Sequence, residues 1–466
     1  MNPPSTTPRR WARAMALFAG LFIGCAAGAI NAESISTQPA GLEQLNEARE
    51  LIRIGRYDDA TPLLQTAVRQ AAPDSLDAAV ALNELGRLDR LTAKYDEAEV
   101  FDRKAVEIET KLSGPDDPAL ATTEENLGEL DNIRDRFDRA KQELGRAMEI
   151  RTKAFGEDNA LTAESMSNLG VVELCLCNID EGEKLCRRAV EIQNHTLKAD
   201  DPDRAVGWDN LANVLEFRSN FVESERLFKR SLELRTRVLG DDHPDVGQSF
   251  DNLGGLYMAW NQPALARRHF KLAEFVRENS LGADHPDTME SLAMLGQEQE
   301  PEPQIYPPEQ TSEKLERALE VEMKVLGPGH WTTQAVQAAL AFSYIQQHRN
   351  PEAGKLLTAA LNASRQASGE AHFNTASLEC EFADYYTAMD QNREAAEQLY
   401  QQSLATTEKL YGSDDRATGI VLKSYAELLR KLNRNDEADK MEARSKAIED
   451  ADKLKNPFVQ LRGPGL

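Results

Sequence analysis

The sequence predicts an all-α protein, a solenoid of about ten stacked helix pairs. Three observations support this: linker motifs recur every 42 residues, small residues recur at fixed places between them, and no segment alternates as a strand does. Such a period is typical of repeats that bury their faces only against their neighbours. Five successive linkers set it, beginning at Gly114, Gly156, Lys198, Gly240 and Gly282.

The composition and charge of the chain limit the classes of partner that it can bind. The chain has 466 residues, of which 41% are hydrophobic and only 6% aromatic, which suits thin helix-pair layers better than one large core. The net charge of -24 argues against nucleic acid and anionic lipid as partners. Two interpretations of the charge remain open, namely solubility and attraction of a basic partner.

Residues 1–32 resemble an export signal. They carry three arginines and no acid, followed by an apolar run from Ala14 to Ile30 and small residues before Ala32. A cleaved secretory signal and a retained membrane anchor are both open. A third alternative is a lipoprotein box ending at Cys25, the residue that would take the lipid. We expect the protein to be exported and either periplasmic, secreted or held at a membrane.

After a linker at residues 33–41, the first helix pair is expected. One helix should run from Leu42 to about Ile54 and a second from about Asp59 to Ala71, with Pro62 tolerated in its first turn. The turn tyrosines Tyr57 and Tyr95 are 38 rather than 42 residues apart. The first pair has therefore lost about one helical turn, and we expect it to cap the array.

The repeat from Gly114 to Gly156 illustrates the others. Asp117 is a good N-cap and Pro118 a good first residue, so a helix should begin there and run to about Ile133. The second helix should run from about Asp138 to Ala154 and end at Gly156.

Small residues mark the places where the two helices of a pair should approach closely. Glycine within a helix costs about 1 kcal/mol relative to alanine, so its recurrence implies a packing reason. The first column is Gly86, Gly128, Gly170, Ala212, Gly254, Gly296, Ala341, Ala383 and Ala426, and alanine, glycine or serine recurs 12 and 19 residues later.

These columns, with an aromatic residue at many turns, resemble the tetratricopeptide repeat. The 42-residue period and the linkers at Leu239–Pro244 and Leu281–Pro286 are similar to the kinesin-light-chain variety. The resemblance covers about Leu42 to Lys453. It implies a right-handed superhelix whose first helices line a concave groove.

Two segments depart from the repeat. Four prolines fall in residues 300–310, where we expect an irregular loop between an array at 42–299 and another at 311–453. A hinge between two arrays is the functional alternative. Residues 454–466 contain two prolines and two glycines that cannot continue a helix, and we expect a disordered tail there.

Four asparagines are the main candidate binding residues. Each lies two positions before a small residue of the first column, a position that faces the groove in the resembled family, where such amides bond the backbone of an extended peptide. A carboxamide can donate and accept, so it can pair with any peptide group. The alternative is that they bond only the adjacent first helix. This asparagine ladder is Asn126, Asn168, Asn210 and Asn252.

Carboxylates near the ladder could form an acidic groove that attracts basic segments. The alternative is that they are ordinary solvated acids. These candidates are Glu125, Glu129, Asp209, Glu216 and Asp251.

No spacing predicts catalysis, metal or cofactor binding. Cys175 and Cys186 are expected to be buried, with Cys186 facing Gly170, while His243 and His285 should cap helices in their linkers. No phosphate loop, nucleophile elbow or zinc signature is present.

We therefore expect a non-catalytic scaffold that binds a peptide or protein segment and takes no cofactor or small-molecule substrate. The alternative function is a membrane-held, lipoprotein-like adaptor that organises an envelope assembly.

Overall fold

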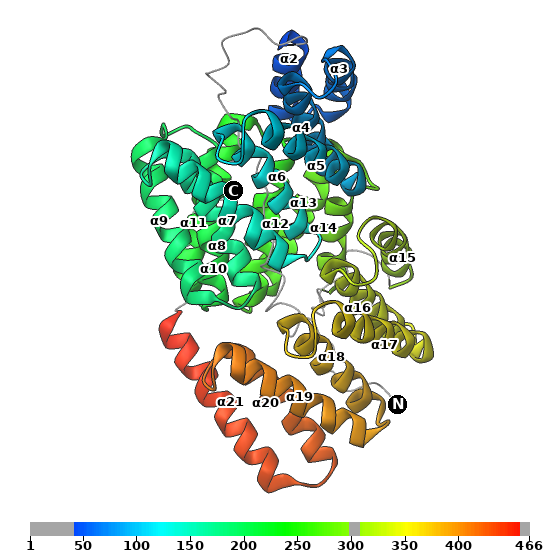
Figure 1. Ribbon diagram of the computed structural model, residues 1–466. Helices are drawn as coiled ribbons and strands as arrows, with labels where there is room; N and C mark the ends of the chain where they lie inside the picture. Colours follow the sequence, from blue (N-terminus) through cyan, green and yellow to red (C-terminus); the bar gives the residue numbers. More distant parts are fainter. Residues whose placement is uncertain (1–41, 298–307, 457–466) are drawn as a thin grey trace.

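The computed structural model describes residues 42–297 and 308–456, and in these residues all regular structure is α-helical (Figure 1). The helices form antiparallel pairs. The first five pairs are α2 (Leu42–Arg53) with α3 (Tyr57–Gln70), α4 (Leu76–Leu91) with α5 (Tyr95–Leu112), α6 (Pro118–Ile133) with α7 (Phe137–Phe155), α8 (Ala160–Cys175) with α9 (Ile179–Thr196), and α10 (Asp203–Phe217) with α11 (Phe221–Leu239). The next five are α12 (Pro244–Ala259) with α13 (Pro263–Leu281), α14 (Pro286–Gln297) with α15 (Pro308–Val325), α16 (Trp331–Gln346) with α17 (Asn350–Ala367), α18 (Phe373–Met389) with α19 (Arg393–Tyr411), and α20 (Arg416–Lys431) with α21 (Asn435–Lys455).

The small first column closes the pairs as expected. A Cβ atom added at Gly128 would lie 2.6 Å from Leu144 Cγ, and one added at Gly254 would lie 2.5 Å from Phe270 Cε1. No side chain fits at these points, so glycine lets the two helices of a pair approach closely.

The linkers start and stop helices by ordinary capping. The Asp117 carboxylate accepts a hydrogen bond from the backbone of Ala119 at 2.9 Å. Gly156 caps α7 with a φ of 86°, a conformation that favours glycine. The helix predicted to end at about Ile133 ends there.

Two predicted boundaries differ from the structure. Helix α15 begins at Pro308, inside the segment expected to be a loop, because proline is tolerated at the first position of a helix. Helix α21 continues to Lys455, two residues past the predicted end of the array. The predicted signal at 1–32, the linker at 33–41, the loop at 298–307 and the tail from 457 lie outside the described residues.

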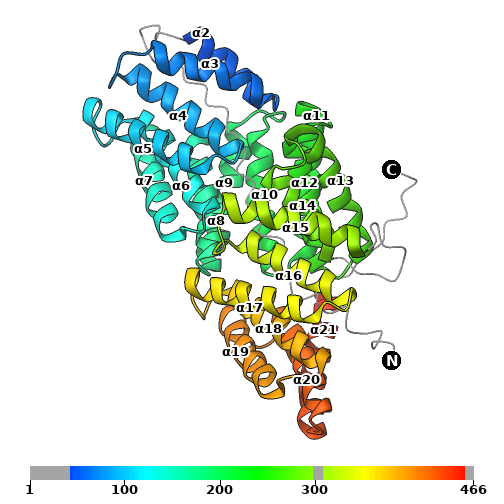
Figure 2. The same cartoon turned by 90° about the vertical axis from the view of Figure 1, so that its right-hand side faces the viewer.

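The pairs wind into a coil, and its second turn lies against its first (Figure 1 and Figure 2). Helix α12 begins where α2 ends, since His243 Nε2 lies 3.2 Å from Arg53 O. Helix α14 begins at the end of α4 in the same way, through His285. First helices of the two turns are thus stacked end to end.

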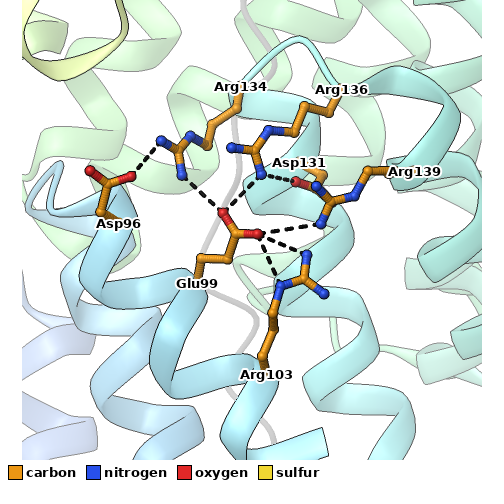
Figure 3. Close-up of polar contacts among 7 residues, drawn as sticks. All are labelled: Asp96, Glu99, Arg103, Asp131, Arg134, Arg136 and Arg139. Carbon is orange, nitrogen blue, oxygen red and sulfur yellow. Dashed lines mark hydrogen bonds and ion pairs between the residues drawn. The ribbon is translucent and has the colours of Figure 1, made fainter.

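Consecutive pairs are also tied at their outer turns by ion networks. The Glu99 carboxylate of α5 accepts hydrogen bonds from Arg103 of the same helix and from Arg134, Arg136 and Arg139 of the next pair (Figure 3). Arg136 reaches Asp131 at 3.0 Å as well. The acids and arginines satisfy one another, so this network links repeats and is not a free binding patch.

Candidate functional site

Five of the first helices are enclosed by their neighbours. No residue of α8, α10, α12, α16 or α18 is exposed, because the second helices cover one side and neighbouring first helices cover the other. The resemblance implied an open concave groove along such helices. In this conformation the ladder helices are instead packed against their neighbours, and a cavity lies near their ends, as described below.

The asparagine ladder lies in this packed interior. Asn168 Nδ2 donates to Glu125 and Glu129 at 2.8 and 2.9 Å, and Asn210 Nδ2 donates to Ser167 at 3.0 Å. Asn126 donates to Asn83. These bonds all run to the preceding first helix, the alternative raised by the sequence. Asn252 accepts from Gln248 of its own helix at 2.9 Å.

Two ladder asparagines keep unused hydrogen-bonding capacity. Asn210 Oδ1 and Asn252 Nδ2 are buried and have no partner, while Asn168 is the half-buried member of the four. Peptide binding by the ladder stays a prediction, and it would require the coil to open around Asn210 and Asn252.

The candidate acids are buried, which neither interpretation of the sequence anticipates. Asp209 receives a bond from Arg235 of α11 at 2.5 Å, and that arginine also donates to Ser249 of the next pair at 2.8 Å. Arg151 joins Glu125 to Ser165, and Arg277 joins Asp251 to Ser291, in the same way. Each buried arginine thus connects two successive pairs, an arrangement that we call an arginine staple.

The fourth pair carries a neutral version of the staple. Gln193 replaces the arginine, Ser167 replaces the acid, and Gly207 replaces the serine of the next pair. A Cβ atom at Gly207 would lie 2.0 Å from Gln193 Oε1, so the glycine makes room for the amide. The arginine and the acid of the staple are therefore both replaced by neutral residues in this pair.

Glu129 and Glu216 complete the candidate acids. Glu129 forms an ion pair with Arg90 at 2.6 Å. Glu216 is buried, and burial raises its pKa to about 8. At neutral pH this carboxyl is mostly protonated and carries little charge.

A cavity of about 160 Å³ lies between the two turns of the coil, and we call it the inter-turn cavity. One side is formed by the ends of α4, α6 and α8, and the other by the beginnings of α12, α14, α16 and α18. Asn132, a residue that is 4% exposed, lines it with a carboxamide oxygen that has no partner in the described chain. Such an acceptor calls for a donor.

Carboxyl groups outnumber free cations around this cavity. The lining arginines are already engaged, Arg90 with Glu129, Arg235 with Asp209, and Arg277 mainly with Asp251. Arg277 also approaches Glu290 at 3.7 Å. Five further carboxyls line the cavity, namely Asp135, Asp245, Asp287, Glu290 and Glu322.

Burial raises the pKa of three of these carboxyls, Asp135, Glu290 and Glu322. It raises the pKa of Glu322 to about 8, although Thr332 donates a hydrogen bond to this carboxyl at 2.8 Å. Burial raises the pKa of Glu290 well above its usual range, with Arg277 opposing the shift. A cation brought into the cavity would favour the charged forms, so these carboxyls are prepared for a positive ligand.

The histidines that were expected to cap helices do so and also bridge the turns. His243 Nδ1 accepts from the backbone of Asp245 at 3.1 Å while Nε2 faces Arg53 O. His330 caps α16 and bonds Ile133 O. The bridging role was missed, because no sequence signal shows which residues meet after a full turn of the coil.

Cys175 and Cys186 are buried free thiols, as expected. Cys186 Sγ would lie 2.6 Å from a Cβ atom at Gly170, which confirms that it faces this glycine. Burial raises the pKa of Cys186 to about 12. Nowhere in the described chain do three or more His, Cys, Asp or Glu side chains gather as a metal site requires. No helix in 42–297 or 308–456 is long and apolar enough to cross a bilayer.

Known proteins identify the repeat. A family model described as tetratricopeptide repeat matches residues 93–153, 119–194 and 203–274, and a second of the same description matches 383–417. The chain therefore contains tetratricopeptide repeats. Its 42-residue repeats resemble the kinesin-light-chain variety in their linkers. A comparison with curated proteins gives no match.

Solved structures show similarity to tetratricopeptide-repeat solenoids at the level of the fold. A Rap protein complexed with competence and sporulation factor is 13% identical, with 89% of this chain and 99% of that chain covered and a TM-score of 0.48. A putative kinesin light chain from Podosopora anserina is 21% identical over 46% of this chain and 98% of that chain, with a TM-score of 0.35. The Rap conjugation gene regulator of plasmid pLS20 is 12% identical, with 70% of this chain and 95% of that chain covered and a TM-score of 0.49.

Proposed function

We propose that this protein is a non-catalytic interaction scaffold that binds a basic peptide or protein segment. In this proposal a lysine or arginine side chain of the partner enters the inter-turn cavity. The observation that carries the proposal is the unpartnered, buried Asn132 oxygen beside five carboxyls, of which Glu290 alone forms an ion pair with an arginine of the described chain. A guanidinium or ammonium group supplies donors and charge together.

The size of the cavity favours a side chain over a whole small molecule. Its volume of about 160 Å³ is room for about five waters, each of which occupies about 30 Å³ in the liquid. Typical small-ligand pockets measure about 300–1,000 Å³. The rest of the bound segment would therefore lie outside the cavity, and the half-buried Asn168 is a candidate to contact its backbone.

Acetyl-arginine amide tests this proposal, with acetyl-citrulline amide as its neutral isostere. We expect the arginine compound, at millimolar concentration, to raise the melting temperature more than the citrulline compound does. Glu322→Gln should remove most of the difference, because glutamine keeps the acceptor for Thr332 but loses the charge. Glu278→Gln, at an exposed site on α13, is the matched control and should leave it unchanged. Equal effects of the two compounds would refute the proposal.

We also propose that the scaffold works outside the cytoplasm. Support comes from the basic start, the apolar run and the small-residue exits within residues 1–32. The alternative function, a membrane-held adaptor, requires either a retained apolar run or a lipid on Cys25. Intact mass of the mature protein decides between them: cleavage after Ala29 or Ala32 supports a released binder, and a lipid adduct at Cys25 supports the adaptor.

A further inference from the structure

A second cavity, at the C-terminal end of the coil, is not part of the proposed binding site. Its volume is about 320 Å³, and we call it the C-terminal cavity. Helices α20 and α21 form one wall and the turn between α12 and α13 forms the other. Earlier second helices pack against the first helix of the next pair, as α13 does against α14 and α19 against α20. Helix α21 is the last described helix and has no such neighbour.

The C-terminal cavity has an apolar part that could take apolar side chains. Ile420, Ile448 and Gly419 line it from the last pair, and Trp260 lines it from the opposite turn. Five charged residues of the last pair also line the cavity, namely Arg416, Lys423, Glu449, Asp452 and Lys453. An apolar cavity of about 150 Å³ can hold a benzene molecule, so about 320 Å³ can hold an aromatic ring together with one aliphatic side chain.

The described chain ends at the rim of this cavity. Asn456 lines it, and three of its hydrogen bonds tie it to the turns after α10 and α12. Its side chain donates to Ser219 O at 2.7 Å and accepts from the backbone of Phe221 at 3.1 Å, and its carbonyl accepts from the Trp260 indole at 3.3 Å. Whatever follows Asn456 therefore starts at the mouth of the cavity.

The next residues supply apolar side chains within reach. The sequence continues Pro457-Phe458-Val459-Gln460-Leu461, with phenylalanine two residues and leucine five residues past Asn456. An extended chain advances about 3.3–3.6 Å per residue, so these residues extend about 7 and 17 Å from Asn456.

We propose that Phe458 and Leu461 dock into the C-terminal cavity, so that this segment covers the last described helix pair and caps the coil. Repeat arrays need terminal caps because an uncovered last repeat leaves apolar surface in water. The tail bound in this way also secures α21 against the turn between α12 and α13 through Asn456.

Fluorine NMR of the full chain with 4-fluorophenylalanine at position 458 tests the proposal. We expect a signal displaced and broadened relative to a free peptide of residues 455–466. Ile448→Ala should move it further, because Ile448 lines the cavity, whereas Leu454→Ala should not, since Leu454 is 85% exposed on the same helix.

Two results would overturn the proposal. One is a sharp signal at the shift of the free peptide in the otherwise unaltered chain, a comparison that does not depend on whether Ile448→Ala folds. The other is a dimer by light scattering that persists in Phe458→Ala, because a second copy would then cover the cavity.

Discussion

His285 Nε2 lies 3.2 Å from Leu91 O, although the two residues are 194 positions apart in the sequence. His285 Nδ1 accepts from the backbone of Asp287 at 3.2 Å, so the proton is on Nε2, which donates to the last carbonyl of α4. One neutral imidazole thus satisfies the end of one helix and the beginning of another. The dipoles of α4 and α14 are aligned head to tail across it.

Replacing His285 with asparagine isolates this bridge. Asparagine is a good N-cap but is too short to reach Leu91, so the cap of α14 should survive while the contact between turns is lost. We expect a loss of about 1 kcal/mol in the free energy of unfolding, and faster hydrogen exchange at the ends of α4 and α14. The control is His348→Asn, an exposed residue with a φ of 61°, which asparagine tolerates. Equal exchange in both variants would contradict a bridging role.

The arginine staples should be sensitive to the loss of one partner. Arg235→Met leaves the buried Asp209 without its cation, and we expect a loss of about 3–5 kcal/mol in urea unfolding. The double variant Arg235→Met with Asp209→Leu should recover most of this loss, because an apolar pair needs no compensation. A double variant no more stable than the single one would show that the staple is not the source of the effect.

Asp102 should destabilise the second pair. It is completely buried opposite Gly86, neither carboxylate oxygen has a partner, and burial raises its pKa well above the usual range. The corresponding residue opposite Gly128 is Leu144. We expect Asp102→Leu to increase the free energy of unfolding by about 1–3 kcal/mol, measured by urea titration at pH 7. Asp58→Leu, at an exposed site, should change it by less than about 0.5 kcal/mol. A destabilised Asp102→Leu protein would reveal an unseen polar role.

Stability should fall as the pH rises from about 4 to about 8. Burial raises the pKa of Glu216 and of Glu322 to about 8, and that of Asp251 to about 7. These carboxyls keep their protons in the folded protein at pH values where the unfolded chain, which releases them near pH 4, has lost them. Their contribution to the free energy of unfolding is therefore complete below about pH 4 and is lost progressively between about pH 4 and about pH 8. Each contributes about 1.4 kcal/mol per pH unit in that window.

The urea midpoint should therefore be higher at pH 5.5 than at pH 8.5. Glu216→Gln combined with Glu322→Gln should reduce the difference, because glutamine does not titrate. A midpoint that rises with pH in the unaltered protein would mean that these carboxyls are charged in the folded state.

Local features of the fold could be predicted from the sequence, and long-range ones could not. Asp117, Pro118 and Gly156 act within one turn of chain, so the ends of α6 and α7 were predicted closely. Gly128 was assigned a packing role because glycine within a helix is less stable than alanine, so its recurrence at this position of the repeat needs a physical reason.

The binding residues were harder to place, because the curvature of the coil decides what faces them. Asn132 has no special spacing in the sequence, and it becomes a candidate only when α12, α14 and α16 begin opposite the end of α6. Asp209 was expected at the surface or in a groove. The signal that could have shown its burial is Arg235, which recurs with Arg277 at the 42-residue period in second helices.

The pH dependence of cation binding tests the central proposal most directly. Acetyl-arginine amide should bind more tightly at pH 9 than at pH 6, because a carboxyl that is protonated at pH 6 must lose its proton to pair with the cation. The affinity should fall roughly tenfold for each such carboxyl and for each pH unit below its pKa. Calorimetry at both values in two buffers of different ionisation enthalpy would count the protons released. The proposal predicts tighter binding at pH 9 and proton release at pH 6, both diminished in Glu322→Gln. Affinity that is independent of pH, with no protons released, would contradict it.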